Sequence, residues 1–354
     1  MSRKCQSNET GTVKGNNNIF ILGIETSCDE TSAAVLLNGT ELLSHIITSQ
    51  IGTHQKYGGV VPEIASREHS LHWQAVVQQA LDQAELAYSD LTAIAVTYGP
   101  GLVGSLLVGV SAAKAIAYAL HIPLVGINHL EGHIYANFLH TPDLEFPLLA
   151  LLVSGGHTHL IFFRGHGDFQ VLGRTRDDAA GEALDKIARV LGLGYPGGPQ
   201  IQLKAREGLA TAFDFPRAML EPGSLDFSFS GVKSSVLNTL NSARMKGQEL
   251  NVADLAASFQ QAIVDVLVRK TKLALKQTGV KTLLLAGGVA ANESLRLALA
   301  CELADMPDQV RLAVPPPLLC TDNGAMIAAA GYYRYIAGDF APWTLNAVPG
   351  LSLA

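Results

Sequence analysis

The sequence predicts an α/β protein built from two related lobes that enclose a ligand cleft. Two repeated patterns support this prediction. A unit of three short strands separated by small-residue turns occurs at residues 19–47 and again at residues 148–172. A strand, a glycine turn and a helix follow each copy, at residues 91–120 and 281–304. The same order of elements at two places is typical of a duplicated domain, and a ligand would then lie between the copies, where the turns meet.

The three strands of each copy are short apolar runs. In the first copy they are expected at Ile19–Leu22, Ala33–Leu37 and Leu42–Ile47, and the Asn-Gly pair between the last two runs is typical of a hairpin turn. In the second copy the corresponding runs are Leu148–Val153, His159–Phe163 and Phe169–Leu172.

The strand–turn–helix units place a glycine turn between an apolar strand and a helix. The strands are Leu91–Val96 and Lys281–Leu285, and the helices that follow are Ser105–Leu120 and Asn292–Ala304. Helical spacing and Ala-rich composition predict three further helices, at Ser70–Ala87, Leu255–Gln277 and Asp322–Tyr335. Another helix is expected to begin within Arg176–Lys186, and Pro315–Pro317 is expected to be a rigid extended lead-in.

Composition limits the class of protein. The 354 residues are 48% hydrophobic and 16% charged, which suits about two globular domains with a sizeable core. A net charge of -6 argues against a self-sufficient basic nucleic-acid binder, although a local basic patch would still allow a nucleic-acid partner. The four cysteines include no CxxC pair and form no disulfide framework, which favours a reducing, cytoplasmic compartment.

The chain is expected to divide into four parts. Residues 1–18 are polar and are expected to form a disordered extension, because they lack the apolar segment of a secretory signal; an organellar address is the alternative. Residues 19–130 are expected to form the first lobe and residues 131–330 the second, and residues 331–354 are expected to pack back on the first. The sequence holds no run of 18 uncharged apolar residues, so no membrane span is expected.

Glycine turns after strands are candidate phosphate sites. Gly99–Gly104 has the spacing GxGxxG, but no acidic residue follows about 20 positions later, which weakens a dinucleotide-binding interpretation. The turns at Ser154–Gly156 and Gly287–Gly288 would let backbone amides approach a phosphate. Each turn alone is more often only a tight turn, whereas several of them in a duplicated layout favour nucleotide binding.

His129 and His133 are four residues apart, which on a helix places both imidazoles on one face, as a metal ion requires. Glu131 lies two residues from each, a rotation of about 200°, so it cannot serve as the base of a zinc protease. Asp322 either caps the last core helix or completes a site of two histidines and one carboxylate, which suits iron or zinc. The alternative for the pair is two partly exposed surface histidines.

An acidic segment opens the helix expected near Arg176. Asp178, Glu182 and Asp185 share one helical face, where they either complement the helix dipole or accept hydrogen bonds from ribose hydroxyls.

Taken together, these segments resemble the tRNA N6-adenosine threonylcarbamoyltransferase (TsaD) family. The resemblance covers residues 20–338, and the matching segments are Gly23–Thr31, His54–His69, Tyr98–Gly104, His129–His133, Val153–Thr158, Asp177–Lys186, Tyr195–Pro199, Phe227–Lys233, Gly287–Asn292 and Asp322–Gly324. It implies the actin and heat-shock ATPase fold, with a nucleotide cleft between two lobes. It also implies transfer of a threonylcarbamoyl group from threonylcarbamoyl-AMP to the N6 amine of adenosine 37 in tRNAs that read codons beginning with A.

The resemblance also implies roles for single residues. It implies His129, His133 and Asp322 as ligands of one divalent metal ion, Fe²⁺ or alternatively Zn²⁺. Asp29 and Glu30 are the candidates for handling a proton or orienting the adenine amine. The donor or an adenine nucleotide would contact Leu152, Val153, Ser154, Gly155, Gly156, Asp185, Gly198 and Asn292. Among these, Gly155 and Gly156 would offer amides to the phosphate and Asp185 would hold the ribose.

Two positions depart from the patterns of the family. Gln202 stands where members usually carry an acid, so this contact to the ribose would lack a charge. Leu152 stands where archaeal and eukaryotic cytosolic members have a tyrosine metal ligand, which indicates the bacterial or organellar type.

That type implies partners besides tRNA, namely an inactive paralogous subunit in a heterodimer and a small ATPase. The segment His54–His69, with Lys56 and Arg67, is expected either to face tRNA or a partner or to be an ordered surface loop. Two other functions remain open: an ATPase switch of the same fold, and transfer of a carbamoyl group to a different acceptor. A metalloprotease is a third alternative, which the position of Glu131 argues against.

Overall fold

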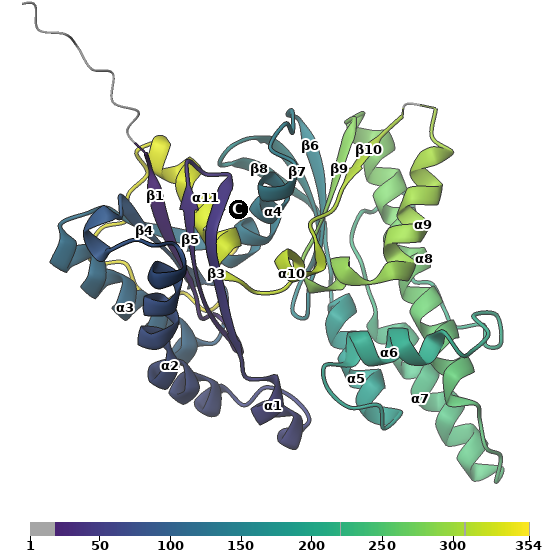
Figure 1. Ribbon diagram of the computed structural model, residues 1–354. Coiled ribbons are helices and arrows are strands. Elements are labelled where there is room, and N and C mark those ends of the chain that lie inside the picture. The colour runs from purple at the N-terminus through teal and green to yellow at the C-terminus, as the bar shows by residue number, and fades with distance from the viewer. Residues whose placement is uncertain (1–17, 220, 308, 354) are drawn as a thin grey trace, which may run out of the picture.

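The computed structural model describes residues 18–219, 221–307 and 309–353 and consists of two five-stranded sheets with helices on their faces (Figure 1). Except for residue 18, the predicted N-terminal extension lies outside the described residues.

The first sheet is formed by β1 (Phe20–Glu25), β2 (Glu30–Leu37), β3 (Glu41–Ser49), β4 (Ala93–Gly99) and β5 (Leu124–Asn128). Its order is β3-β2-β1-β4-β5, with β1 to β3 antiparallel and β4 and β5 parallel to β1. Helices α2 (Pro62–Gln83) and α3 (Val103–Leu120) pack against each other and against this sheet.

The second sheet is formed by β6 (Leu148–Val153), β7 (Thr158–Gly165), β8 (Asp168–Arg174), β9 (Thr282–Ala286) and β10 (Arg311–Ala313). Its order is β10-β9-β6-β7-β8, again with an antiparallel meander followed by two parallel strands. Strands β6 to β10 therefore repeat the topology of β1 to β5, which confirms the predicted duplication.

The helices of the second lobe are α5 (Ala180–Val190), α6 (Gly197–Ala205), α7 (Ser230–Met245), α8 (Val252–Thr278) and α9 (Glu293–Ala304). Alternate residues of β6 pack into different hydrophobic cores, because side chains along a strand point to opposite faces of the sheet. Leu149, Leu151 and Val153 pack toward α8, whereas Leu148, Ala150 and Leu152 face the other lobe.

Two helices lie between the sheets and join the lobes. Helix α4 (His129–His140) packs on the second sheet, α11 (Gly324–Ile336) packs on the first, and the two helices pack on each other. Helix α11 also lies very close to β1, because Gly23 has no side chain: a Cβ atom on Gly23 would lie 2.2 Å from the carbonyl oxygen of Gly324.

The predicted lobe boundaries at 130 and 330 therefore need correction, since they fall inside α4 and α11. Most of α11, which was assigned to the second lobe, packs on the first sheet because its apolar face continues that core. The segment 337–353 also contacts the first lobe. The amide of Val348 donates to the carbonyl of Tyr98 (2.8 Å), and Lys114 donates to the carbonyl of Leu345 (3.0 Å).

The segment between β3 and α2 also differs from the prediction. It holds the short helix α1 (Ile51–His54) and a 3₁₀ turn (Gln55–Tyr57), and α2 then begins at Pro62, eight residues earlier than predicted. Val61 is extended and proline suits the first helical position, so the helix starts there. His54 and His69 are both fully buried, so they face the protein interior and not a partner.

The proline run is extended only in part, since Pro317 starts the short helix α10 (Pro317–Cys320). Helix α3 is the one described helix whose length and apolarity match a membrane span, with a mean hydropathy of 1.7. Lys114 interrupts its apolar run, and α3 packs against α2 and β4.

Candidate active site

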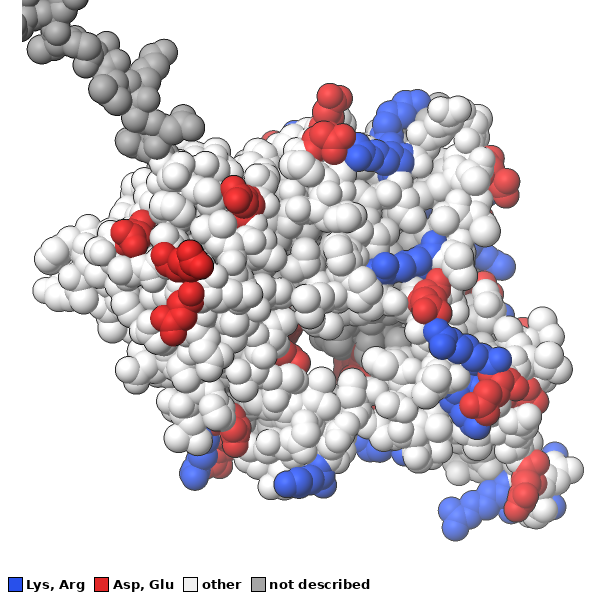
Figure 2. All heavy atoms as spheres, in the orientation of Figure 1, with Lys and Arg blue, Asp and Glu red and all other residues white. Residues whose placement is uncertain are grey.

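A cleft of about 590 Å³ lies between the lobes, at the ends of equivalent strands. The loops that follow β1 and β6 both line it, as expected for a ligand site at the carboxyl ends of strands in a duplicated α/β fold. Figure 2 shows an opening between the lobes with acidic atoms at its margin. Most of the predicted site residues line this cleft: Asp29, Glu30, His129, Ser154, Gly155, Gly156, Asp185, Gly198, Gln202, Asn292 and Asp322.

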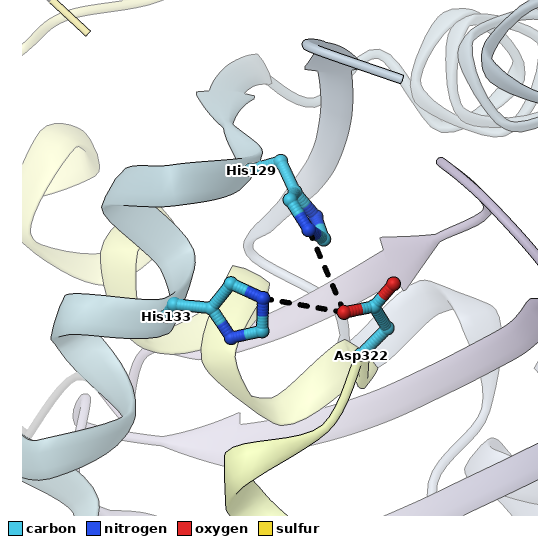
Figure 3. A group of neighbouring side chains, drawn as sticks. All are labelled: His129, His133 and Asp322. Atoms are coloured by element: carbon cyan, nitrogen blue, oxygen red, sulfur yellow. Dashed lines mark ion pairs between the residues drawn. The ribbon is translucent and has the colours of Figure 1, made fainter. Parts of the chain in front are cut away.

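The predicted metal ligands lie together (Figure 3), and two of them, His129 and Asp322, line the cleft, whereas His133 lies buried behind it. Oδ1 of Asp322 is 3.5 Å from Nε2 of His129 and 3.2 Å from Nε2 of His133. The ligand atoms of all three residues lie within 4.8 Å of one another. Both histidines are buried, so the alternative of two partly exposed surface histidines is wrong.

These residues fit a divalent metal ion. Both ring nitrogens of His133 are buried without a hydrogen bond, although Nε2 lies within ion-pair distance of Asp322. A buried imidazole without a partner is costly, and a cation would satisfy it. Asp322 does not cap α11, as one prediction had it, because Asn323 accepts the hydrogen bond from the amide of Met326 (2.9 Å). The Asp322 carboxylate is thus available beside the histidines.

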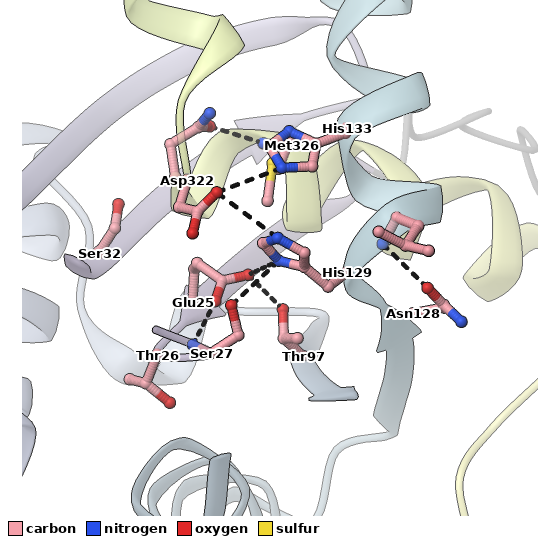
Figure 4. Close-up of polar contacts among 12 residues, drawn as sticks. Glu25, Thr26, Ser27, Ser32, Thr97, Asn128, His129, His133, Asp322 and Met326 are labelled. Atoms are coloured by element: carbon pink, nitrogen blue, oxygen red, sulfur yellow. Dashed lines mark hydrogen bonds and ion pairs between the residues drawn. The ribbon is translucent and has the colours of Figure 1, made fainter. Parts of the chain in front are cut away.

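A further residue, Glu25 at the end of β1, orients His129 (Figure 4). Its Oε2 lies 3.1 Å from Nδ1 of His129 and accepts a hydrogen bond from Thr97 (2.6 Å), while Ser27 Oγ is also 3.1 Å from Nδ1. A carboxylate behind a histidine is the usual support of a metal ligand. The sequence analysis missed this role; the available signal was an acid in an otherwise apolar strand.

The charges in this group determine its ionisation. Burial lowers the pKa of His129, but the carboxylates of Asp322 and Glu25 raise it to about 9. Burial raises the pKa of Asp322, yet the charge of His129 brings it down to about 2. Burial likewise raises the pKa of Glu25, and His129 overcomes this effect and holds the pKa below its ordinary value. His129 and the two carboxylates therefore stabilise one another's charged forms.

Glu131 points away from this group, as its helical position predicts. Its carboxylate is 1% exposed and pairs with Arg334 of α11 at 2.7 Å. The structure therefore offers no base at Glu131 for a metalloprotease.

Asp29 is the last residue of the loop between β1 and β2, and Glu30 is the first residue of β2. Three groups outside the loop contact the carbonyl oxygens of three consecutive residues. The amide of Leu102 donates to Ser27 (2.8 Å), His69 Nε2 lies 2.9 Å from the Cys28 oxygen, and the amide of Gln50 donates to Asp29 (2.9 Å). These contacts fix the course of the loop along the cleft wall.

Both carboxylates have limited contact with solvent. Asp29 is 6% exposed. Burial, and next the charge of Asp29, raises the pKa of Glu30 well above its ordinary value. The end of this loop and the start of β2 therefore present two neighbouring acids to the cleft.

The glycines Gly155 and Gly156 are exposed, and a Cβ atom at either would meet no atom within 4 Å. The loop that carries them rests on the first turn of α5, where a Cβ on Gly181 would lie 2.5 Å from the carbonyl oxygen of Ser154. Leu152 and Val153, the last two residues of β6, do not line the cleft, because they are fully buried in the two cores. Their contribution is to place the loop that follows.

The polar residues on this side are held by local hydrogen bonds. Asp185 accepts from the amide of Gly197 (2.6 Å). Asn292 caps α9 through the amide of Leu295 (3.0 Å) and donates to Gln260 (2.9 Å). Gln202 accepts from the amide of Glu293 (2.8 Å), so it ties α6 to α9.

The other two acids of the predicted acidic face serve the structure. Asp178 precedes α5 and pairs with Lys186 (2.7 Å) and Lys233, while Glu182 pairs with Lys186 (2.8 Å). The structure does not bring them to the cleft with Asp185. His157 and Tyr195 do line it, although the sequence analysis gave neither a role.

Comparison with solved structures supports the fold. A HypF from T. kodakarensis aligns with 93% of this chain and 49% of its own length, with a TM-score of 0.60 and 16% identity. Component A of the Acidaminococcus fermentans (R)-2-hydroxyglutaryl-CoA dehydratase aligns with 90% of this chain and 99% of its own, with a TM-score of 0.52 and 18% identity. These neighbours confirm the actin- and heat-shock-ATPase-like fold.

Sequence comparison gives the family. The family model described as tRNA N6-adenosine threonylcarbamoyltransferase matches residues 41–329. A protein of that name from Desulfitobacterium hafniense is 74% identical over 96% of this chain and 99% of its own length. Relatives of the same name from Geobacillus thermodenitrificans and Clostridioides difficile are 57% and 56% identical over 97% and 95% of this chain and 99% of their own. Identity at this level over nearly the whole length of both chains means that this chain belongs to the tRNA N6-adenosine threonylcarbamoyltransferase (TsaD) family.

Proposed function

We propose that this chain is an acyltransferase that moves the threonylcarbamoyl group from threonylcarbamoyl-AMP to the N6 amine of adenosine 37 in tRNAs that read codons beginning with A. The observation that carries the proposal is that one cleft holds three kinds of group together. These are the candidate metal ligands, the exposed Ser154–Gly156 loop and the acids Asp29 and Glu30.

In this reaction the N6 nitrogen attacks the carbamoyl carbon, and the bond between that carbon and the phosphate oxygen breaks. AMP leaves and the N6 amine loses one proton. An aromatic amine is a weak nucleophile, so placement of the two reactants contributes more than a strong base. We assign Asp29 and Glu30 to orienting the amine or taking its proton, because both line the cleft beside the metal ligands.

The second lobe would bind the donor. The amides of Gly155 and Gly156 face open space and suit the phosphate. Asp185 lines the same cleft and would accept hydrogen bonds from the ribose hydroxyls, with Gly198 and Gln202 beside it. Asn292 would contact the adenosine portion while it caps α9.

His129, His133 and Asp322 would hold the metal ion, which we propose to be Fe²⁺, with Zn²⁺ as the alternative for this donor set. A bound divalent cation supplies a Lewis acid that polarises the acyl carbonyl. Glu25 keeps His129 in the orientation that this requires.

We also propose the partners implied by the family resemblance, an inactive paralogous subunit in a heterodimer and a small ATPase, and a cytoplasmic location. A groove between α2 and α3 supports a protein partner, since it is lined by Trp73, Leu107 and small residues. Leu71 and Leu107 on these helices are 73% and 42% exposed. Size-exclusion chromatography of the chain mixed with the paralogous subunit tests the heterodimer and its surface. Leu107→Glu is expected to weaken co-elution, and a variant that co-elutes with the subunit as the wild type does would contradict the choice of this groove.

A reconstituted assay tests the reaction itself. The chain is mixed with unmodified tRNA, threonylcarbamoyl-AMP and the partner subunits, and the digested nucleosides are analysed by mass spectrometry. The expected result is one threonylcarbamoyl group added to adenosine, lost in His129→Ala and Asp322→Ala. Steady ATP hydrolysis by the chain alone, without modified tRNA, would instead support an ATPase switch.

A further inference from the structure

A short segment of the first lobe crosses to the second lobe below the cleft. This segment, Gln50–Gly59, is called the arm and contains α1 and the following 3₁₀ turn. In Figure 1 α1 projects from the end of β3 toward the region of α5. The side-chain amide of Gln55 donates to the carbonyl of Tyr195 (2.9 Å), and Arg189 at the end of α5 donates to the carbonyl of Gly58. The arm therefore contacts the second lobe at two points, the end of α5 and the segment between α5 and α6.

The other end of the arm is fixed to the loop that carries the candidate acids. The amide of Gln50 donates to the carbonyl of Asp29 (2.9 Å). The Gln50 side chain is buried, and its Oε1 lies 3.0 Å from Nε2 of the buried His54. The arm is thus hydrogen-bonded directly to the backbone at Asp29.

Tyr195, which the arm contacts, also binds the side chain of Asp29. Its hydroxyl donates to Oδ2 of Asp29 at 3.3 Å, and its ring lines the cleft. The contacts form a closed ring that leads from the Asp29 backbone through Gln50, the arm, Gln55 and Tyr195 to the Asp29 side chain. Because Tyr195 belongs to the second lobe and Asp29 to the first, the last hydrogen bond joins the two lobes across the cleft.

We infer that Tyr195 is a positioning residue that orients the Asp29 carboxylate from across the cleft, and that the arm holds Tyr195 in place for this task. This inference rests on the proposed function, in which Asp29 acts on the adenine amine. Burial, and next the charge of Asp29, raises the pKa of Tyr195 above its ordinary value, so the phenol keeps the proton that it donates. The distance of 3.3 Å exceeds the ~2.7–2.8 Å typical of an O–H···O bond, so a small further closure around substrate would strengthen the contact.

The decisive variants are Tyr195→Phe, which removes only the hydroxyl, and Gln55→Ala, which removes the arm's contact to the Tyr195 carbonyl. Tyr57→Phe is the matched control, because Tyr57 lies in the same arm and is 60% exposed. In the reconstituted assay, Tyr195→Phe is expected to lower kcat about 10- to 100-fold with the donor KM little changed, since a hydrogen bond to a charged group is lost. Gln55→Ala is expected to lower kcat less, and Tyr57→Phe to match the wild type.

A double-mutant cycle shows whether Tyr195 acts through Asp29. If it does, Tyr195→Phe causes little further loss in an Asp29→Ala background. Independent, multiplying losses would overturn the inference, as would a Tyr195→Phe variant with unchanged kcat or with a change confined to KM.

Hydrogen exchange of the arm separates this inference from the proposed function, because it needs no activity. Amides of the arm are expected to exchange faster in Gln55→Ala than in the wild type and Tyr57→Phe. Equal exchange would overturn the role given to the arm. A wild-type chain that makes no modified tRNA would reject the proposed function, while the exchange result would still decide whether the second lobe holds the arm.

Discussion

Replacement of Glu131 by Gln is expected to destabilise the protein by about 3 kcal/mol. Glu131 lies on α4 between the two histidines of the candidate metal site, and its carboxylate is 1% exposed. Both of its oxygens lie within 3.3 Å of the Arg334 guanidinium, which joins α4 to α11. Glutamine has the same shape but no charge, so the substitution leaves the arginine without its buried partner.

The magnitude follows from what remains around Arg334. Removing one member of a buried ion pair costs about 3–5 kcal/mol, because the other charge stays desolvated. The Arg334 side chain is 27% exposed and keeps Asp339 at 2.6 Å, which places the expected loss at the lower end of this range. Burial raises the pKa of Glu131 and Arg334 offsets only part of that effect, so the pair itself gives little net stabilisation. Removing both charges, as in Glu131→Leu with Arg334→Met, should therefore cost less than the single change.

Urea unfolding followed by far-UV circular dichroism measures these differences. The control is Glu63→Gln, which makes the same chemical change in an ion pair with Arg67 whose members are each 75% exposed. An exposed pair of this kind contributes at most about 0.5 kcal/mol. A Glu131→Gln loss no larger than that of the control, or a double variant less stable than Glu131→Gln, would refute the reasoning from burial.

Three further predictions concern the site and its supports. Gly181→Ala should raise the donor KM about tenfold, because the new Cβ would push the Ser154–Gly156 loop; Gly231→Ala, at a helical position with open space, should leave KM unchanged. Glu25→Gln should weaken metal binding about 10- to 100-fold, measured by titration with a competing chelator, while Glu63→Gln, the same change at an exposed position, should not. Asp178→Asn should lower stability at pH 7 by about 1.5–3 kcal/mol. Burial raises the pKa of Asp178 but its two lysines hold it below the ordinary value, so the difference from wild type in urea midpoint should shrink as pH falls below about 4; a pH-independent difference would contradict the assignment.

Much of the fold was accessible from the sequence because its signals are local. Apolar runs, glycine turns and helical spacing act over fewer than about 20 residues, and they located β1 to β4 and β6 to β9, whereas the short strands β5 and β10 were not predicted. The start of α2 was missed because Pro62 opens a helix whose first turns are polar. The boundary between the lobes was misplaced because no local signal shows which sheet will receive an Ala-rich helix such as α11.

The sequence by itself predicted the duplicated topology, the family and the His129–His133 pair, since each rests on motifs of short, fixed spacing. It left open whether Asp322, far along the chain, caps a helix or joins the candidate metal site. Tertiary structure alone decided which polar groups become buried and which partners they receive. Glu25 meets His129 from 104 positions away, Glu131 meets Arg334 across 203, and Tyr195 meets Asp29 across 166. The free energy of a buried charge or hydroxyl depends on such partners, so these roles emerge only when packing brings distant segments together.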